Sequence, residues 1–167
     1  MREHILGPLG MSDTAFKITP AMRARLATVH GRDNGVLAPM AFELPQEPQF
    51  EMGGGGLYST VGDYLKFVRM ILNRGTANGT RLLAPATIDQ MGQNNMGPLK
   101  VHRLETIVPS LSNDAEFFPE MPKSWGLSFM INEQPAPTGR TAGSLAWAGL
   151  ANTFFWMDPL KGKNIVD

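Results

Sequence analysis

The chain has 167 residues, 43% of them hydrophobic, a length and composition typical of one domain with an apolar core. Its 15 Lys and Arg residues balance its 15 Asp and Glu residues, so no summed field would draw the protein to nucleic acid or to an anionic membrane. Cysteine is absent, which excludes disulfides, thiolate nucleophiles and thiolate-bound zinc.

The sequence contains no membrane or export signal. No stretch approaches the roughly 20 apolar residues that a spanning helix needs. The apolar start of the chain is broken by Gly7 and Pro8 before a signal-peptide core could form. The sequence therefore predicts a soluble protein without a membrane partner. Its location stays open, because residues 1–6 bear on export only if Met1 is the natural N-terminus, and a cytoplasmic location is slightly favoured over a periplasmic one.

The N-terminal part shows little periodic patterning. Residues 1–6 have room for the last turns of a helix, which Gly7 would close in the C′ position, with Pro8 behind it. From Lys17 to Pro48 neither the helical nor the strand period is sustained, so this region is predicted to consist of loops.

The clearest element is a helix predicted over residues 61–73. Thr60 is the candidate N-cap, and the Asp63 carboxylate, three residues later, could reach back to free N–H groups of the first turn. Gly75 suits a left-handed position after the helix, and a second helix is predicted from Pro85 to about Met91. The apolar face of the first helix is predicted from residues at helical spacing, Val61, Leu65, Val68 and Leu72.

The run Gly53–Gly56 precedes the first helix. A phosphate-binding loop would need a preceding strand and either a Lys-Ser/Thr pair or the spaced dinucleotide pattern, and this run has neither. We therefore expect the glycines to permit left-handed conformations or a close approach of the backbone.

The C-terminal part changes to a strand pattern. Residues 92–122 are predicted to be loops, and strands are predicted over 125–131, 144–150 and 152–157, with 164–167 as the opening of a fourth. Consecutive strands of this kind predict an antiparallel meander. The single domain is thus divided into helices and loops over 1–122 and antiparallel strands over 123–167.

Local patterns supply no complete catalytic site. His4, His30 and His102 lie far apart without acidic partners at ligand spacing, so neither a metal nor a cofactor is expected. A Gly-x-Ser-x-Gly elbow is absent, Gly143-Ser144 being the nearest approach. No serine is followed three residues later by lysine, so no serine is activated locally.

Several long segments nevertheless resemble one family. Residues 7–16, 53–64 and 81–85 resemble, in order and spacing, the class C β-lactamase-like serine hydrolases. Within that superfamily, residues 125–129 and 146–159 are most similar to the family VIII carboxylesterases. The resemblance implies an α+β fold of the β-lactamase and penicillin-binding-protein type, with an antiparallel sheet flanked by helices. This chain would supply its C-terminal half.

The resemblance also implies where the catalytic groups lie. The family's nucleophile, in a Ser-x-x-Lys motif, and its tyrosine base precede the segment that begins at Gly7, and neither motif is present here. Tyr58 and Tyr64 do not fit the tyrosine motif, so neither is assigned that role. The fragment alone is therefore expected to be inactive.

The third family motif does have a counterpart. Trp147-Ala148-Gly149 occupies the position of the β-lactamase Lys-Thr-Gly, as Trp-x-Gly does in similar esterases, which implies that these three residues bind substrate. Gly149 would let substrate approach the strand, and the backbone N–H of Leu150 would be an oxyanion donor. Because an indole at Trp147 cannot pair with a carboxylate as lysine does, neutral esters should be preferred over β-lactams, whose turnover would be slow.

Other interpretations remain open. From the pattern alone, Trp147 could be a core aromatic residue, and Trp125 and Trp156 are expected in the core. The favoured function is hydrolysis of small carboxylic esters through an acyl-serine intermediate. The alternative is a non-catalytic binding or structural protein that retains the pocket wall. An exposed half-sheet would also need cover, from a second copy of the chain or from a complementing N-terminal segment.

Overall fold

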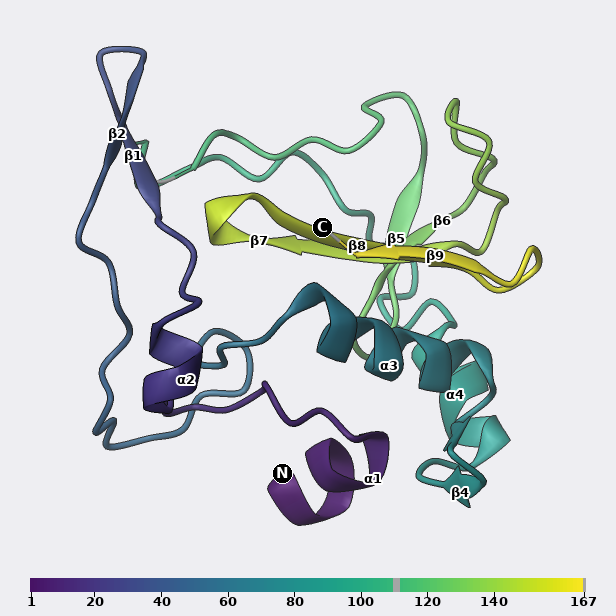
Figure 1. The fold of residues 1–167 in the computed structure, drawn as a ribbon. Coiled ribbons are helices and arrows are strands. Elements are labelled where there is room, and N and C mark those ends of the chain that lie inside the picture. Colours follow the sequence, from purple (N-terminus) through teal and green to yellow (C-terminus); the bar gives the residue numbers. More distant parts are fainter. Residues whose placement is uncertain (110–111, 167) are drawn as a thin grey trace.

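A five-stranded antiparallel sheet organises the computed structural model of the protein, which describes residues 1–109 and 112–166. The strands follow one another as a meander, in the order of the chain, so the predicted meander is confirmed (Figure 1). They are β5 (Lys123–Trp125), β6 (Met130–Asn132), β7 (Leu145–Gly149), β8 (Thr153–Asp158) and β9 (Lys163–Val166).

The prediction of a single strand over residues 125–131 is wrong, because the structure has two strands there, β5 and β6, joined by a turn. The chain turns between β5 and β6, where the Gly126 N–H donates to the Phe129 carbonyl oxygen at 2.8 Å. A Cβ atom at Gly126 would lie 1.9 Å from the Met91 carbonyl oxygen, so only glycine fits this reversal. The apolar run masks the turn in the sequence.

Two helices confirm the strongest predictions. α3 (Val61–Leu72) crosses beneath the sheet (Figure 1), and α4 (Pro85–Met91) follows it. The Thr60 hydroxyl accepts the Asp63 N–H at 3.2 Å, so the predicted N-cap is confirmed. Gly75 has a φ of +86°, as expected of a left-handed position after a helix.

The buried face of α3 differs from the predicted one. Val68 is fully buried and Leu72 packs against the core, as expected, but Val61 is 50% exposed. Ile71 is buried, and Tyr64 packs against the same core, so the inward face is rotated around the helix. The apolar side chains of this core come from the N-terminal turns, α3, α4 and the sheet: Leu6, Leu9, Met11, Val68, Met70, Ile71, Ile88, Phe129, Ile131, Leu145 and Met157.

The N-terminal turns end later than predicted. A π-helical turn, η1 (Arg2–Leu6), continues into α1 (Gly7–Leu9), so Gly7 has a helical φ of −62°. Gly10, with a φ of +66°, is the left-handed cap. The prediction for Gly7 is wrong because Pro8 is compatible with the first turn of a new helix and does not end the old one.

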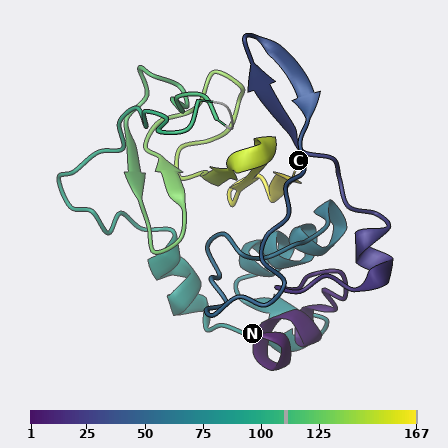
Figure 2. The same cartoon turned by 90° about the vertical axis from the view of Figure 1, so that its left-hand side faces the viewer.

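Residues 17–50 form an arm that stands away from the core (Figure 2). It holds α2 (Pro20–Arg23) and an exposed hairpin of β1 (His30–Asp33) and β2 (Val36–Pro39), where loops were expected. The turn residues Asn34 and Gly35 both have positive φ, the conformation that Asn-Gly favours in two-residue hairpins.

Three smaller features complete the fold: a short hairpin after α3, the loops of residues 92–122 and the glycine run before α3. A second small hairpin, β3 (Thr76–Ala77) with β4 (Thr80–Arg81), follows α3. In the described part of 92–122 the only pairing is an isolated bridge of Leu104 with Ala115, so the loop prediction is confirmed. In the run Gly53–Gly56, a Cβ at Gly56 would lie 2.8 Å from the Met52 carbonyl oxygen, which supports the close-approach interpretation.

Candidate functional site

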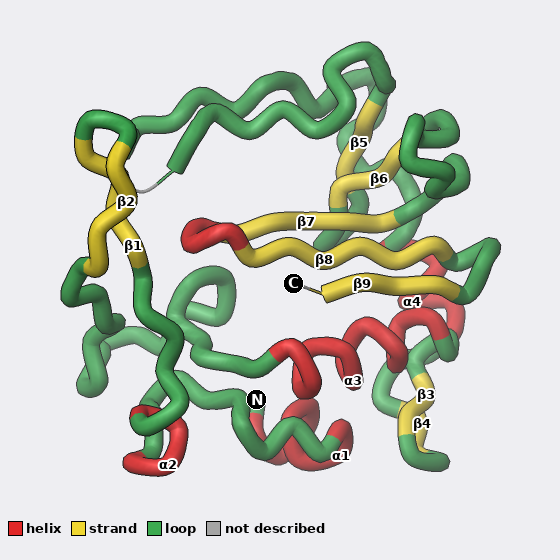
Figure 3. The backbone as a smooth tube through the Cα atoms, turned by 45° about the horizontal axis from the view of Figure 1, so that its top comes forward, coloured by secondary structure: helices red, strands yellow, loops and turns green. Residues whose placement is uncertain are grey.

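The C-terminal end of β7 extends beyond its neighbour β6. In the described part of the chain, the ladder with β6 pairs only Leu145 and Ala146, whereas the ladder with β8 continues to the pair Gly149 and Thr153. Figure 3 shows β7 and β8 reaching past β6 to their connecting turn. The segment 147–149, predicted to bind substrate, is therefore bordered by β8 on one side and lacks a ladder partner from β6 on the other.

The predicted oxyanion donor lies in the turn that follows. Leu150 begins the 3-10 turn η2 (Leu150–Asn152), which connects β7 to β8. Ala151 and Asn152 have φ values of +60° and +61°, so the backbone reverses sharply here. The four predicted site residues, Trp147, Ala148, Gly149 and Leu150, are thus consecutive at one corner of the sheet.

Gly149 also has a structural reason to be glycine. Its Cα hydrogen faces the paired strand, and a Cβ there would lie 2.8 Å from the Thr153 hydroxyl oxygen. A larger residue would therefore require the Thr153 hydroxyl to move. The predicted role of Gly149 in substrate binding remains a prediction.

A hollow of about 380 Å³ lies beside this corner. Trp147 lines it while contacting Trp125 edge-on, with ring centroids 4.4 Å apart, and Phe117, at 6.5 Å. Trp147 therefore both packs in an aromatic cluster and faces the hollow. The residues that line the hollow are Phe117, Phe118, Met130, Thr138, Arg140, Ala146, Trp147, Phe154, Phe155 and Trp156.

Two of these residues were not anticipated as part of a site. Trp156, expected in the core, is half-buried and lines the hollow, because it shares a sheet face with its ladder partner Ala146. Arg140 lies with its guanidinium carbon 4.9 Å from the Phe118 ring centroid and 5.6 Å from that of Trp156. Burial lowers the pKa of Arg140, against the attraction of Asp158.

A buried lysine holds the loop side of the hollow. Lys123 on β5 donates through Nζ to the carbonyl oxygens of Phe118, at 3.0 Å, and Met121, at 2.9 Å. Glu116 lies 3.6 Å away from the same ammonium group. These contacts satisfy a charge that is otherwise costly to bury, and they fix residues 116–121 on the sheet.

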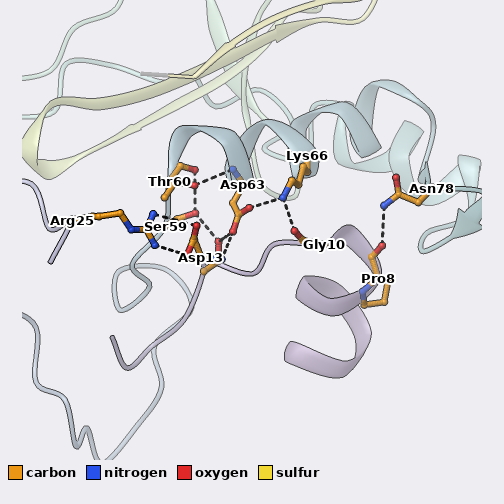
Figure 4. A network of polar contacts seen from close by, with 10 residues as sticks. Pro8, Gly10, Asp13, Arg25, Ser59, Thr60, Asp63, Lys66 and Asn78 are labelled. Atoms are coloured by element: carbon orange, nitrogen blue, oxygen red, sulfur yellow. Dashed lines mark hydrogen bonds and ion pairs between the residues drawn. The ribbon is translucent and has the colours of Figure 1, made fainter. Parts of the chain in front are cut away.

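A second polar cluster joins the N-terminal segment to α3 (Figure 4). The buried Asp63 carboxylate accepts the Asp13 N–H at 2.7 Å, the Thr14 hydroxyl at 3.1 Å and the Lys66 ammonium at 2.8 Å. Lys66 also donates to the Gly10 carbonyl oxygen at 2.5 Å. The prediction that the Asp63 carboxylate would accept free N–H groups of its own first turn is therefore wrong, because the carboxylate binds the N-terminal segment and Lys66 instead.

Neither Tyr58 nor Tyr64 has the surroundings expected of a catalytic base. Burial raises the pKa of Tyr64 to about 12, and its ring packs against Phe67 and Phe155. A general base needs the opposite shift, towards neutral pH. The Tyr58 hydroxyl accepts the Leu44 N–H at 2.7 Å.

Within residues 1–109 and 112–166 no cluster of His, Asp and Glu is suited to a metal, and no helix is long and apolar enough to span a membrane.

Comparison with known proteins identifies the family. The family model described as Beta-lactamase matches residues 1–166. The chain belongs to the beta-lactamase family. Its antiparallel sheet flanked by helices is accordingly the β-lactamase and penicillin-binding-protein-like fold that the sequence predicted.

The relatives of this family member include an esterase and an acyltransferase. The acyltransferase is monacolin J acid methylbutanoyltransferase of Aspergillus terreus, 29% identical over 97% of this chain and 41% of its own length. Protein Rv1367c of Mycobacterium tuberculosis is 32% identical over 94% of this chain and 39% of its own length. Lovastatin esterase of Penicillium rubens is 30% identical over 93% of this chain and 40% of its own length. The chain thus spans about 40% of the length of these curated relatives.

Solved structures agree with this placement. An unliganded simvastatin synthase (LovD) of Aspergillus terreus superposes with a TM-score of 0.70 and 26% identity, over 99% of this chain and 42% of the other. EstCE1, a hydrolase with promiscuous acyltransferase activity, gives a TM-score of 0.70 at 20% identity, over 99% and 43% of the two chains. The second likeness concerns the fold alone.

Proposed function

We propose that this chain forms the substrate-facing wall of a serine hydrolase that cleaves small carboxylic esters. The beta-lactamase family match and the relatives with esterase and acyltransferase names support acyl-transfer chemistry of this general kind. The observation that carries the proposal is the end of β7, where Trp147, Ala148 and Gly149 extend past β6 beside the aromatic hollow. The ester group of the substrate would lie along residues 147–149, on the side of β7 that β6 does not pair with.

The proposed reaction has two steps. A serine oxygen, supplied by a Ser-x-x-Lys segment outside these 167 residues, forms a bond to the ester carbonyl carbon. The alcohol then leaves with the proton that a base took from the serine. Water next attacks the acyl-serine, which releases the acid and restores the serine proton. In both steps the Leu150 N–H would donate to the negatively charged carbonyl oxygen.

Trp147 would set the substrate preference. An indole offers an aromatic face and a single N–H, whereas a lysine ammonium would attract an anionic substrate. Neutral esters are therefore the proposed substrates, and β-lactam turnover would be slow. The Phe117, Phe154 and Trp156 rings of the hollow would favour an apolar acyl or alcohol group.

A non-catalytic binding protein is the second candidate. It is favoured by one observation, that no serine in the sequence is followed three residues later by lysine. The two candidates share the pocket wall and differ in whether a reactive serine completes it.

Intact-mass spectrometry with a fluorophosphonate distinguishes the candidates. The 18.2 kDa chain is expected to gain no adduct and to show no saturable hydrolysis of a short p-nitrophenyl ester. A longer polypeptide that contains this chain and an upstream Ser-x-x-Lys should gain one adduct and hydrolyse the ester. An unreactive longer polypeptide would favour the binding protein, and a labelled 18.2 kDa chain would contradict our placement of the nucleophile.

Variants of Leu150 test the oxyanion donor in the active polypeptide. Leu150→Pro removes the N–H and should lower kcat by about 10²–10³-fold. Leu150→Ala keeps the N–H and should retain activity within a few-fold. Equal losses in the two variants would contradict the backbone role.

A further inference from the structure

The hollow beside β7 combines aromatic walls with a guanidinium group. Rings from the 112–122 loop and from β8 surround it, and its volume of about 380 Å³ falls within the range of small-molecule sites. Arg140 lies at the Trp156 end of this wall, and Phe154 lies two residues along the same strand. The distance between those positions along β8 is about 7 Å, so the charged and apolar ends are separated.

Arg140 has no acidic partner in the described part of the chain. Its contacts there are the faces of Phe118 and Trp156, and no carboxylate lies within ion-pair distance. Asp158 attracts Arg140 electrostatically, but the two form no ion pair, and the Asp158 carboxylate has other partners. Its carboxylate accepts the Thr141 N–H at 2.9 Å, the Thr141 hydroxyl at 2.6 Å and the Lys161 N–H at 3.1 Å.

A half-buried guanidinium of this kind suits an anionic ligand. The two aromatic faces hold the planar group in place, and its side-chain N–H groups donate no hydrogen bond within the described part of the chain. Two of these donors match the oxygens of a carboxylate. Partial burial strengthens such a pair relative to one in water. A single guanidinium balances one negative charge, whereas a phosphate dianion would require further donors.

We propose that this hollow binds a hydrophobic monocarboxylate. The carboxylate pairs with Arg140, and the apolar tail lies among Phe117, Trp147 and Phe154. The Phe117, Trp147 and Phe154 side chains also line the wall proposed above for ester binding. Carboxylate binding needs no nucleophile, so its failure and the failure of ester hydrolysis can be told apart. Arg140 adds a charged subsite to a wall that the family motif alone would make neutral.

Calorimetric titration of the 167-residue chain with octanoate and octanamide tests the proposal. These probes share their tail and differ in charge. Octanoate is expected to bind about 10-fold or more tightly than octanamide, the range for a charge-assisted hydrogen-bonded pair. Arg140→Gln should remove this preference, whereas Arg69→Gln, on the exposed face of α3, should preserve it.

Phe154→Ala provides a second variant with a different expected result. It shortens the apolar wall and should weaken both probes while preserving their ratio. Near-ultraviolet circular dichroism checks that each variant is folded. Equal affinity of the unmodified chain for the two probes, or no binding of octanoate, would overturn the proposal without any variant. A charge preference that survives in folded Arg140→Gln would also overturn it.

Discussion

The core under the sheet and the arm of residues 17–50 are stabilised in different ways. In the core, Val68 on α3 and Met157 on β8 have no exposed surface, and their neighbours are apolar. In the arm, Val36 is 67% exposed, and ion pairs such as Lys17–Glu47, 2.6 Å long, join its segments at the surface. Burial of apolar surface contributes far more free energy than exposed ion pairs do. The candidate site lies on β7 and β8, in the sheet that contributes to this core, and not in the arm.

Truncation in the core should have the largest effect. Met157→Ala leaves a cavity between β8 and α3, and we expect it to lower the free energy of unfolding by about 2–5 kcal/mol. Val36→Ala in the arm is the matched control and should change it by less than about 0.5 kcal/mol. Urea unfolding measures both. Similar losses in the two variants would remove the distinction between core and arm.

The polar cluster that joins the N-terminal segment to α3 should have the next largest effect. Asp63→Asn removes the charge that faces Lys66 and replaces an acceptor with an N–H₂ group near the Thr14 hydroxyl. We expect a loss of about 1–3 kcal/mol in the free energy of unfolding. Glu51→Gln, at an exposed position in the described chain, should have little effect. An unchanged urea midpoint for Asp63→Asn would show that the cluster does not stabilise the packing of the N-terminal segment against α3.

The hairpin turn should respond locally. Gly35 has a φ of +81°, so Gly35→Ala strains the turn by about 1–2 kcal/mol. Because the arm contributes little to the core, amide exchange should accelerate in β1 and β2 but not in α3. Faster exchange throughout the chain would mean that the arm and the core unfold together.

The smallest expected effects concern the exposed ion pairs. Hydrogen bonds from Arg25 and Arg23 lower the pKa values of Asp13 and Glu43 below their ordinary 3.8 and 4.5. A lowered pKa in the folded state stabilises the protein above the ordinary pKa, and this contribution is lost as the pH falls through the folded value. NMR titration should find both midpoints lowered, and Arg25→Gln should return that of Asp13 towards 3.8. Identical midpoints with and without Arg25 would refute the pair.

Strong local signals made much of the fold predictable. The N-cap Thr60 and the apolar period of α3 are local signals, and so are the aromatic and apolar runs of β7 and β8. The hairpin at Asn34 and Gly35 carried an Asn-Gly signal, but its flanking strands are short, and β1 is polar, so neither strand showed a sustained period. The break between β5 and β6 depends on the contact of Gly126 with Met91, which is long-range and has no local signature.

The site was predictable only in part. Sequence order alone places residues 147–150 together, because they are consecutive. The inclusion of Arg140 depends on its packing against Phe118 and Trp156, from a distant loop and a neighbouring strand. The family motif singled out Trp147, which does line the hollow, but nothing in the sequence indicated that Trp156 would line it too, since the face of a strand residue depends on strand register.

The buried Lys123 ammonium has a chemical consequence. Its Nζ is enclosed by the carbonyl oxygens of Phe118 and Met121, whereas the Lys17 side chain is 50% exposed. An amine-reactive reagent should therefore acylate Lys17 quickly. It should leave Lys123 unmodified as long as the loop of residues 116–121 stays packed on the sheet. The labelling rate of this one amine would then record how often the loop that walls the hollow lifts from the sheet.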